Sequence, residues 1–284
     1  MNEEFCKIIL LTVIKFIKAK LAKSKSILTN KSKMRKNYFT KALIVLAIIT
    51  ISCDDSVSDE FEEANGKVAE KLVSSAIITS IGDSSDKTTL FLEYDADKRL
   101  SSVSNGEDTD RFIYSNGDLV NVTGQGDNLS IEEFYQSPYD AFEIGQIEQY
   151  DSNLNPTKLV FFQEIYENNT ARKVEYTAEI TYDDAPNPYF FTLKSAGIID
   201  VLDGIQLNFS MTPQASEIIK ARKLLFKNNP SKVLYRDHNN QPLVEIDVDY
   251  VYDADNYPVS ATVKAVNFDE NEESFYTATF NYLQ

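Results

Sequence analysis

The chain has 284 residues, 43% of them hydrophobic, which is enough for a core of one or two domains and excludes a wholly disordered chain. Residues 1–52 carry eleven Lys or Arg and two Asp or Glu, so residues 53–284 carry 17 basic and 42 acidic side chains, a net charge of −25. A region as acidic as residues 53–284 repels nucleic acid, and we expect no nucleic-acid partner. Beyond Cys53 there is no cysteine, which excludes a disulfide or a thiolate zinc site there.

Residues 1–33 precede a segment that already holds a complete export signal. They contain an apolar and then lysine-rich stretch, IILLTVIKFIKAKLAKSK. One interpretation is an upstream extension from a start codon assigned too early, with translation beginning at Met34. The alternative is an extra amphipathic or membrane-inserted helix. We favour the first, because a second hydrophobic start adds nothing to export.

Residues 34–52 have the layout of a secretory signal peptide. The segment begins with the basic residues Arg35, Lys36 and Lys41, continues with the apolar residues 42–51 and ends with the small residue Ser52. The ten apolar residues are too few to span a bilayer, which disfavours a short transmembrane helix. Because the segment ends on Cys53, it resembles a bacterial lipoprotein signal, which implies that this cysteine is lipidated and becomes the mature N-terminus. Thr50 departs from the usual Leu and resembles the looser signals of Bacteroidota.

Residues 53–72 are acidic and poor in apolar side chains, which predicts a flexible, solvated tether. Asp54 and Asp55 directly follow Cys53. In enteric bacteria an aspartate there implies retention at the inner membrane, whereas in Bacteroidota an acidic run resembles a surface-export signal.

Residues 73–284 are predicted to form a single β-rich domain. Residues 172–182 and 244–252 alternate apolar and polar side chains, as half-buried strands do. The strand candidates recur every ten to twenty residues with Asp, Asn, Gly or Pro turns between them. This spacing predicts a mainly β fold, an antiparallel meander of repeated hairpins. One or two helices are expected around residues 195–226, from helical spacing in 213–226 and a shorter candidate at 193–204.

Five connectors share an aromatic residue at a strand end, an Asp or Asn turn, and an apolar residue that opens the next strand. They are residues 93–103, 113–122, 149–160, 234–246 and 251–263. We expect their Asp and Asn side chains to bond the turn backbone. These units resemble tyrosine–aspartate (YD) hairpin repeats, and YDDAPNPYF, FKNNPSKV and YDADNYPVSATV resemble motifs of uncharacterised domain families in Bacteroidota surface lipoproteins. The resemblance covers roughly residues 75–284 and implies a fold and a location, without an established activity.

The search for chemistry yields no catalytic residue, no metal site and no cofactor. His238 is the only histidine, and its turn sequence YRDHNNQP favours a solvated side chain over a catalytic one. DSNLNP (151–156) begins like a calcium loop, but Pro156 and Phe162 stand where an EF-hand needs Gly and Glu. We interpret it as a turn, although clustered surface carboxylates leave a weak calcium site as an alternative.

Tyrosines at hairpin ends are candidates for a second role. We favour a structural one, with an exposed binding stripe as the alternative, and the residues concerned are Tyr94, Tyr114, Tyr150, Tyr235 and Tyr252.

The sequence therefore predicts a lipoprotein anchored through Cys53 in the outer membrane and facing the cell exterior. We expect a non-catalytic binding or structural module whose partner is a glycan or an envelope protein. One alternative is a carboxylate-dependent hydrolase of envelope or dietary glycans, which needs convergent carboxylates with raised pKa in a cleft. Another is a periplasmic carrier of an apolar ligand, which needs a large apolar concavity on one sheet face.

Overall fold

The computed structural model describes residues 56–124, 127–132, 139–140, 146–167, 170–208 and 218–284. The chain divides into two units, Met1–Asp55 and Ser56–Gln284, and every described residue belongs to the second. The predicted signal peptide and lipidation site lie outside the described residues. Within the described ranges, no helix has the length and apolar character needed to cross a membrane.

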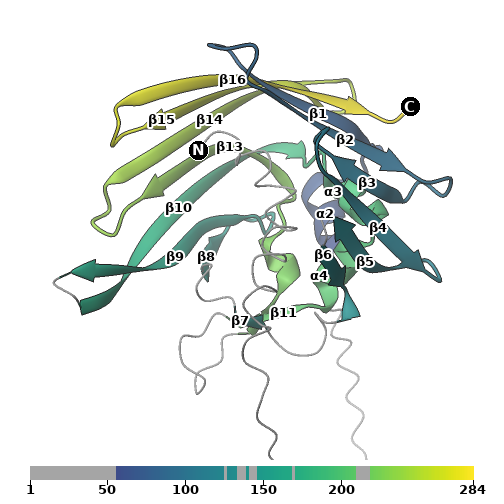
Figure 1. The fold of residues 1–284 in the computed structure, drawn as a ribbon, viewed down its shortest axis with the longest axis horizontal. Helices are drawn as coiled ribbons and strands as arrows, with labels where there is room; N and C mark the ends of the chain where they lie inside the picture. The colour runs from purple at the N-terminus through teal and green to yellow at the C-terminus, as the bar shows by residue number, and fades with distance from the viewer. Residues whose placement is uncertain (1–55, 125–126, 133–138, 141–145, 168–169, 209–217) are drawn as a thin grey trace, which may run out of the picture. The chain divides into compact units, whose positions relative to one another are not determined.

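A 13-stranded antiparallel sheet dominates the described unit, which confirms the predicted mainly β meander (Figure 1). Its order from edge to edge is β6-β5-β4-β3-β2-β1-β16-β15-β14-β13-β10-β9-β8. Its strands are β1 (Val73–Ser80), β2 (Lys87–Tyr94), β3 (Leu100–Ser104), β4 (Thr109–Ser115), β5 (Asp118–Gly124), β6 (Asp127–Ser130), β8 (Gln146–Tyr150), β9 (Pro156–Glu167), β10 (Thr170–Pro186), β13 (Asn228–Arg236), β14 (Pro242–Tyr252), β15 (Pro258–Asn267) and β16 (Glu272–Tyr282). A small sheet contains β7 (Tyr139–Asp140), β11 (Gln206–Asn208) and β12 (Ile218–Lys220).

Strand β2 illustrates why these segments form half-buried strands. Leu90 and Leu92 are 3% and 4% exposed, whereas Phe91 between them is 50% exposed, because successive side chains of a strand point to opposite faces. The buried face curves around the helices (Figure 1), and we call the opposite one the outer face. Burial of each such leucine stabilises the fold by about 1.5–3 kcal/mol.

Two short helices, α3 (Phe190–Ser195) and α4 (Ile198–Gly204), lie within the curve of the sheet (Figure 1). They confirm the predicted helical insertion near residue 195. Phe190 and Ile199 are 1% and 2% exposed, so both helices contribute to the core. Gly197 joins them with φ +71°, and a Cβ there would lie 3.2 Å from the Cβ of Leu119. Glycine thus permits both the left-handed turn and the close approach to β5.

The helix predicted over residues 213–226 is wrong where the structure describes it. Strand β12 pairs with β11, and Ala221–Leu224 form a 3₁₀ helix, η2. The apolar spacing suits a helix, but strand pairing and burial of Arg222 beside Asp203 determine the local conformation. Tertiary contacts override a local preference of this size.

The predicted flexible tether at residues 53–72 is also wrong in part. Val57–Asn65 form a helix, α2, that packs into the core. Val57 and Phe61 are 0% and 3% exposed, and the Phe61 ring stacks on that of Phe190 with 3.6 Å between centroids. The acidic composition belongs largely to the exposed face of an amphipathic helix, so the folded domain begins before residue 73.

Strands β1 and β16 lie side by side near the centre of the sheet. They pair from Val73 opposite Tyr282 to Ser80 opposite Tyr276, which joins segments about 200 residues apart in the chain. This one pairing connects β2–β6 to β8–β15 within the main sheet.

Candidate functional site

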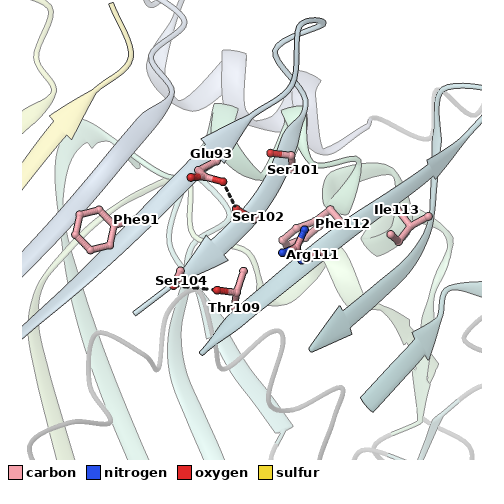
Figure 2. Close-up of a pocket in the computed structure, with 9 residues that line it drawn as sticks. All are labelled: Phe91, Glu93, Ser101, Ser102, Ser104, Thr109, Arg111, Phe112 and Ile113. Carbon is pink, nitrogen blue, oxygen red and sulfur yellow. Dashed lines mark hydrogen bonds between the residues drawn. The ribbon is translucent and has the colours of Figure 1, made fainter. Parts of the chain in front are cut away.

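An open hollow of about 530 Å³ lies on the outer face of β2, β3 and β4 (Figure 2). Small-molecule sites typically occupy about 300–1,000 Å³. The hollow forms because β3 presents serines to the surface, whereas β2 and β4 present larger side chains. Its lining residues are Phe91, Glu93, Ser101, Ser102, Ser104, Thr109, Arg111, Phe112 and Ile113.

One row of side chains crosses the hollow in register: Glu93 of β2, Ser102 of β3 and Arg111 of β4. The Ser102 hydroxyl donates to the Glu93 carboxylate over 2.9 Å. The backbones of Glu93 and Arg111 are about 10 Å apart, the width of two strand spacings. Phe91 and Ile113, which are 50% and 43% exposed, lie on opposite sides of the serine floor (Figure 2).

Two lysines of the outer face are paired with carboxylates on neighbouring strands. Lys232 lies 3.0 Å from Glu245, and Lys264 lies 2.8 Å from Glu273. Arg111 is exposed and its side chain makes no ion pair with any residue that the structure describes. The hollow therefore presents a guanidinium whose donors are available to a ligand.

Five tyrosine hydroxyls inside the curve of the sheet link the end of one strand to the start of the preceding strand. Each donates to a backbone carbonyl near the start of the preceding strand, over 2.6–3.1 Å: Tyr94 to Val73, Tyr114 to Leu100, Tyr182 to Pro156, Tyr250 to Pro230, and Tyr282 to Pro258. We call these five the tyrosine row. Burial raises the pKa of Tyr94 to about 12. In these strands the aromatic residue of the repeated pattern therefore has a structural role, since its hydroxyl links two neighbouring strands.

The predicted binding stripe is not an exposed row in the structure. Tyr94 and Tyr114 belong to the tyrosine row, and the Tyr252 hydroxyl donates to Asp183, so the fold uses all three hydroxyls. Tyr235 is half-buried, and Tyr150 is 38% exposed. The hydroxyls of Tyr94, Tyr114 and Tyr252 are therefore hydrogen-bonded within the fold.

Four hairpins close with the same turn, which confirms the predicted role of its aspartate. One carboxylate oxygen accepts from the amides two and four residues further on, at Asp95, Asp151, Asp237 and Asp253. The third residue after each aspartate has φ between 60° and 65°: Lys98, Leu154, Asn240 and Asn256. DSNLNP is therefore a turn of this kind.

Asp95→Ala and Asp253→Ala should each lower stability by on the order of 1 kcal/mol, the net contribution of a typical hydrogen bond. For a domain of this size, the melting temperature should fall by roughly 2–4 °C. Thermal melts with and without calcium distinguish a turn from an ion site. A calcium-dependent rise in the wild type that both variants lose would contradict the turn interpretation.

His238 lies exposed in the β13–β14 turn, with Nε2 3.1 Å from the side-chain amide of Asn239. This position matches the predicted solvated turn residue. Among the described residues, no three His, Cys, Asp or Glu side chains lie close enough to hold a metal ion.

A buried charge cluster, which we call the α2 clamp, fixes α2 to the rest of the domain. Glu60 is 3% exposed, and its carboxylate oxygens lie 3.0 Å from Nζ of Lys223 and 3.0 Å from Nζ of Lys227, whose side chain is fully buried. Arg222 lies 3.7 Å from Glu60 and 3.3 Å from Asp203. Burial alone would raise the pKa of Glu60, but the ammonium groups of Lys227 and Lys223 outweigh burial and hold this pKa below its usual value.

Sequence reasoning missed both the hollow and the α2 clamp. Cys53, Asp54 and Asp55, the predicted anchor and export signal, lie outside the described residues. For the hollow, the available signal was LSSVS, a strand of small residues between TLFLEY and RFIY. A small strand between larger ones leaves a depression on the face where the serines point.

No family model and no curated protein matches the chain. Among solved structures, porin-like proteins from Bacteroides uniformis and Bacteroides vulgatus are similar at TM-scores of 0.32 and 0.27, both at 10% identity. The first match covers 76% of this chain and 99% of the other, and the second covers 75% and 99%. A domain assigned to outer-membrane lipoprotein sorting, from Vibrio parahaemolyticus, has a TM-score of 0.25 at 8% identity, over 80% of this chain and 91% of the other. TM-scores this low do not establish a common fold.

Proposed function

We propose that this chain is a lipid-anchored lipoprotein of the outer membrane, facing the cell exterior, that acts as a non-catalytic binding module. The observation that carries the binding role is the outer-face hollow. There a guanidinium, a carboxylate and exposed apolar side chains surround a serine floor, on a face where Lys232 and Lys264 are ion-paired. A few directed polar groups beside apolar surface are typical of ligand sites.

The carboxylates of the described residues support binding over hydrolysis. Every Asp or Glu with a clear pKa shift is shifted downward: Asp59, Glu60, Asp83, Asp95, Asp237 and Asp253. A general acid near neutral pH needs the opposite shift. These groups serve caps, turns and ion pairs.

The apolar-carrier alternative receives less support from the described residues. It needs an apolar concavity on the inner face of the sheet. Side chains of α3 and α4 pack into the core on that face, with Phe190, Leu193, Ile199 and Leu202 each less than 9% exposed.

The α2 helix shortens the proposed link to the membrane. Asp54 and Asp55 are the only residues between Cys53 and the helix-capping Ser56. With at most about 3.6 Å per residue, the lipidated cysteine would hold the folded domain against the bilayer surface.

Metabolic labelling with a palmitate analogue tests the anchor. The wild type should be labelled, and Cys53→Ser should fall to background and leave the membrane fraction, because the thiol carries the lipid. Cys6→Ser is the matched control and should keep both its label and its location. Equal labelling of Cys53→Ser and wild type would contradict the proposed anchor. Protease treatment of intact cells tests separately whether the domain faces the cell exterior.

A further inference from the structure

The hollow combines protein groups that can recognise hydroxyl-rich ligands, and several of these groups point outward from the sheet. Arg111 offers guanidinium donors, Glu93 offers carboxylate acceptors, and the two are separated by Ser102 in one register row. Charge-assisted hydrogen bonds of this kind are about twice as strong as neutral ones. The half-exposed ring of Phe91 stands beside them as apolar surface.

We propose that the hollow binds a neutral glycan, with a sugar ring lying along β3 between β2 and β4; this inference rests on the proposed binding function. In this arrangement ring hydroxyls receive hydrogen bonds from Arg111 and donate them to Glu93. The apolar face of a sugar packs on Phe91. The spacing of about 10 Å between the flanking backbones leaves room for one ring above the serine floor.

The charge distribution selects a neutral glycan over an acidic one. Residues 53–284 carry a net charge of −25, and a polyanion would be repelled as it approaches. Glu93 lies inside the hollow, and Glu107 and Asp108 are exposed in the β3–β4 turn at one end of it. Arg111 alone cannot offset these carboxylates.

The geometry also disfavours a peptide or protein ligand. The hollow lies on the face of three paired strands, so their backbone groups are already bonded within the sheet, and strand addition is not available. Phe91 and Ile113 are separated by serines and do not form the clustered apolar centre of a protein interface (Figure 2).

Affinity electrophoresis of the full-length protein in detergent tests this inference, with gels that contain soluble starch, xylan, galactomannan or polygalacturonate. We expect retardation by at least one neutral polymer, and little effect of salt, because no ion pair with the ligand forms. Phe91→Ala and Arg111→Ala should each weaken that retardation about tenfold, as expected for the loss of one strong contact.

Phe275→Ala and Lys264→Ala are matched controls on the outer face of β15 and β16. Phe275 is 41% exposed, close to the 50% of Phe91, and Lys264 lies 5.8 Å from its ring centroid. These variants should keep wild-type retardation within about twofold. Unchanged melting temperatures in all four variants would show that the fold is intact.

Three results would overturn the inference: no retardation by any neutral polymer, equal retardation of wild type and hollow variants, or retardation by polygalacturonate alone that salt abolishes. Each would leave the proposed lipid anchor in place, because palmitate labelling of Cys53 tests the anchor separately. Loss of that labelling with intact glycan binding would overturn the anchor and retain the site.

Discussion

Replacing Glu60 with alanine should lower the free energy of unfolding by about 3–5 kcal/mol, the usual cost of breaking a buried ion pair from one side. In a domain of this size the melting temperature should fall by about 6–20 °C. The buried ammonium of Lys227 would keep the carbonyls of Leu154 and Leu225 as acceptors but would lose its carboxylate partner. Thermal and urea unfolding followed by circular dichroism measure the change.

Glu62→Ala is the matched control, because Glu62 lies exposed on the same helix. Its effect should stay within about 0.5 kcal/mol. The folded-state pKa of Glu60 lies below the ordinary value of 4.5. Its ionised form therefore contributes stability above pH 4.5, and this contribution is lost as the pH falls through the folded-state pKa. Wild type and Glu60→Gln should converge in stability at acid pH, and equal effects of Glu60→Ala and Glu62→Ala would contradict the clamp.

Alkaline pH should unfold the domain cooperatively between about pH 10 and 12, because of the tyrosine row. Burial raises the pKa of Tyr94 from 10.0 to about 12, and burial also raises the pKa of Tyr114, Tyr182 and Tyr282. A raised folded-state pKa gives stability that is complete below pH 10 and lost as the pH rises through the folded-state value. For each buried tyrosine, the free energy of unfolding falls by on the order of 1 kcal/mol per pH unit above pH 10. The total stability of a domain is only about 5–15 kcal/mol.

Ultraviolet absorbance of the phenolate and far-ultraviolet circular dichroism, recorded together, check this expectation. Ionisation of the tyrosine row and the loss of secondary structure should occur in one transition, since ionisation of these buried hydroxyls needs unfolding. Tyr94→Phe should make the pH dependence of the free energy of unfolding shallower by about one proton above pH 10. The same variant should be less stable by about 1 kcal/mol at neutral pH, because the Val73 carbonyl loses its hydrogen-bond donor. Phenolate absorbance that rises smoothly from pH 10 with unchanged circular dichroism would contradict the role of the row.

Much of the fold was predictable because turn chemistry and strand periodicity are local. Asp95 and Asp253 determine their hairpins through bonds within four residues, so the sequence is sufficient to recognise them. The helix α2 was also recognisable: Ser56 and Asp59 form a capping box, and Phe61 lies four residues after Val57. The acidic composition outweighed this signal in the prediction of a tether.

The candidate site was less predictable because it depends on register. Glu93, Ser102 and Arg111 become neighbours only through two strand pairings, and a register shift in the β2–β3 pairing near Tyr94 influences which side chains face outward. The α2 clamp depends on contacts across more than 160 residues, since Glu60 meets Lys223 and Lys227. Such pairings follow from tertiary topology, which local patterns do not contain.

The central position of the β1–β16 pairing has a kinetic consequence. Closing a loop of ~200 residues costs roughly 5 kcal/mol of chain entropy before the pair forms, and such non-local pairing slows folding. Strand β16 is synthesised after the other described strands of the main sheet, and its pairing with β1 joins the two halves of that sheet. Until β16 arrives, β1 has one open edge, and an unpaired edge is a template for aggregation. The main sheet is therefore completed only after β16 is available, and the interval before β16 docks is the period when this open edge favours misassembly.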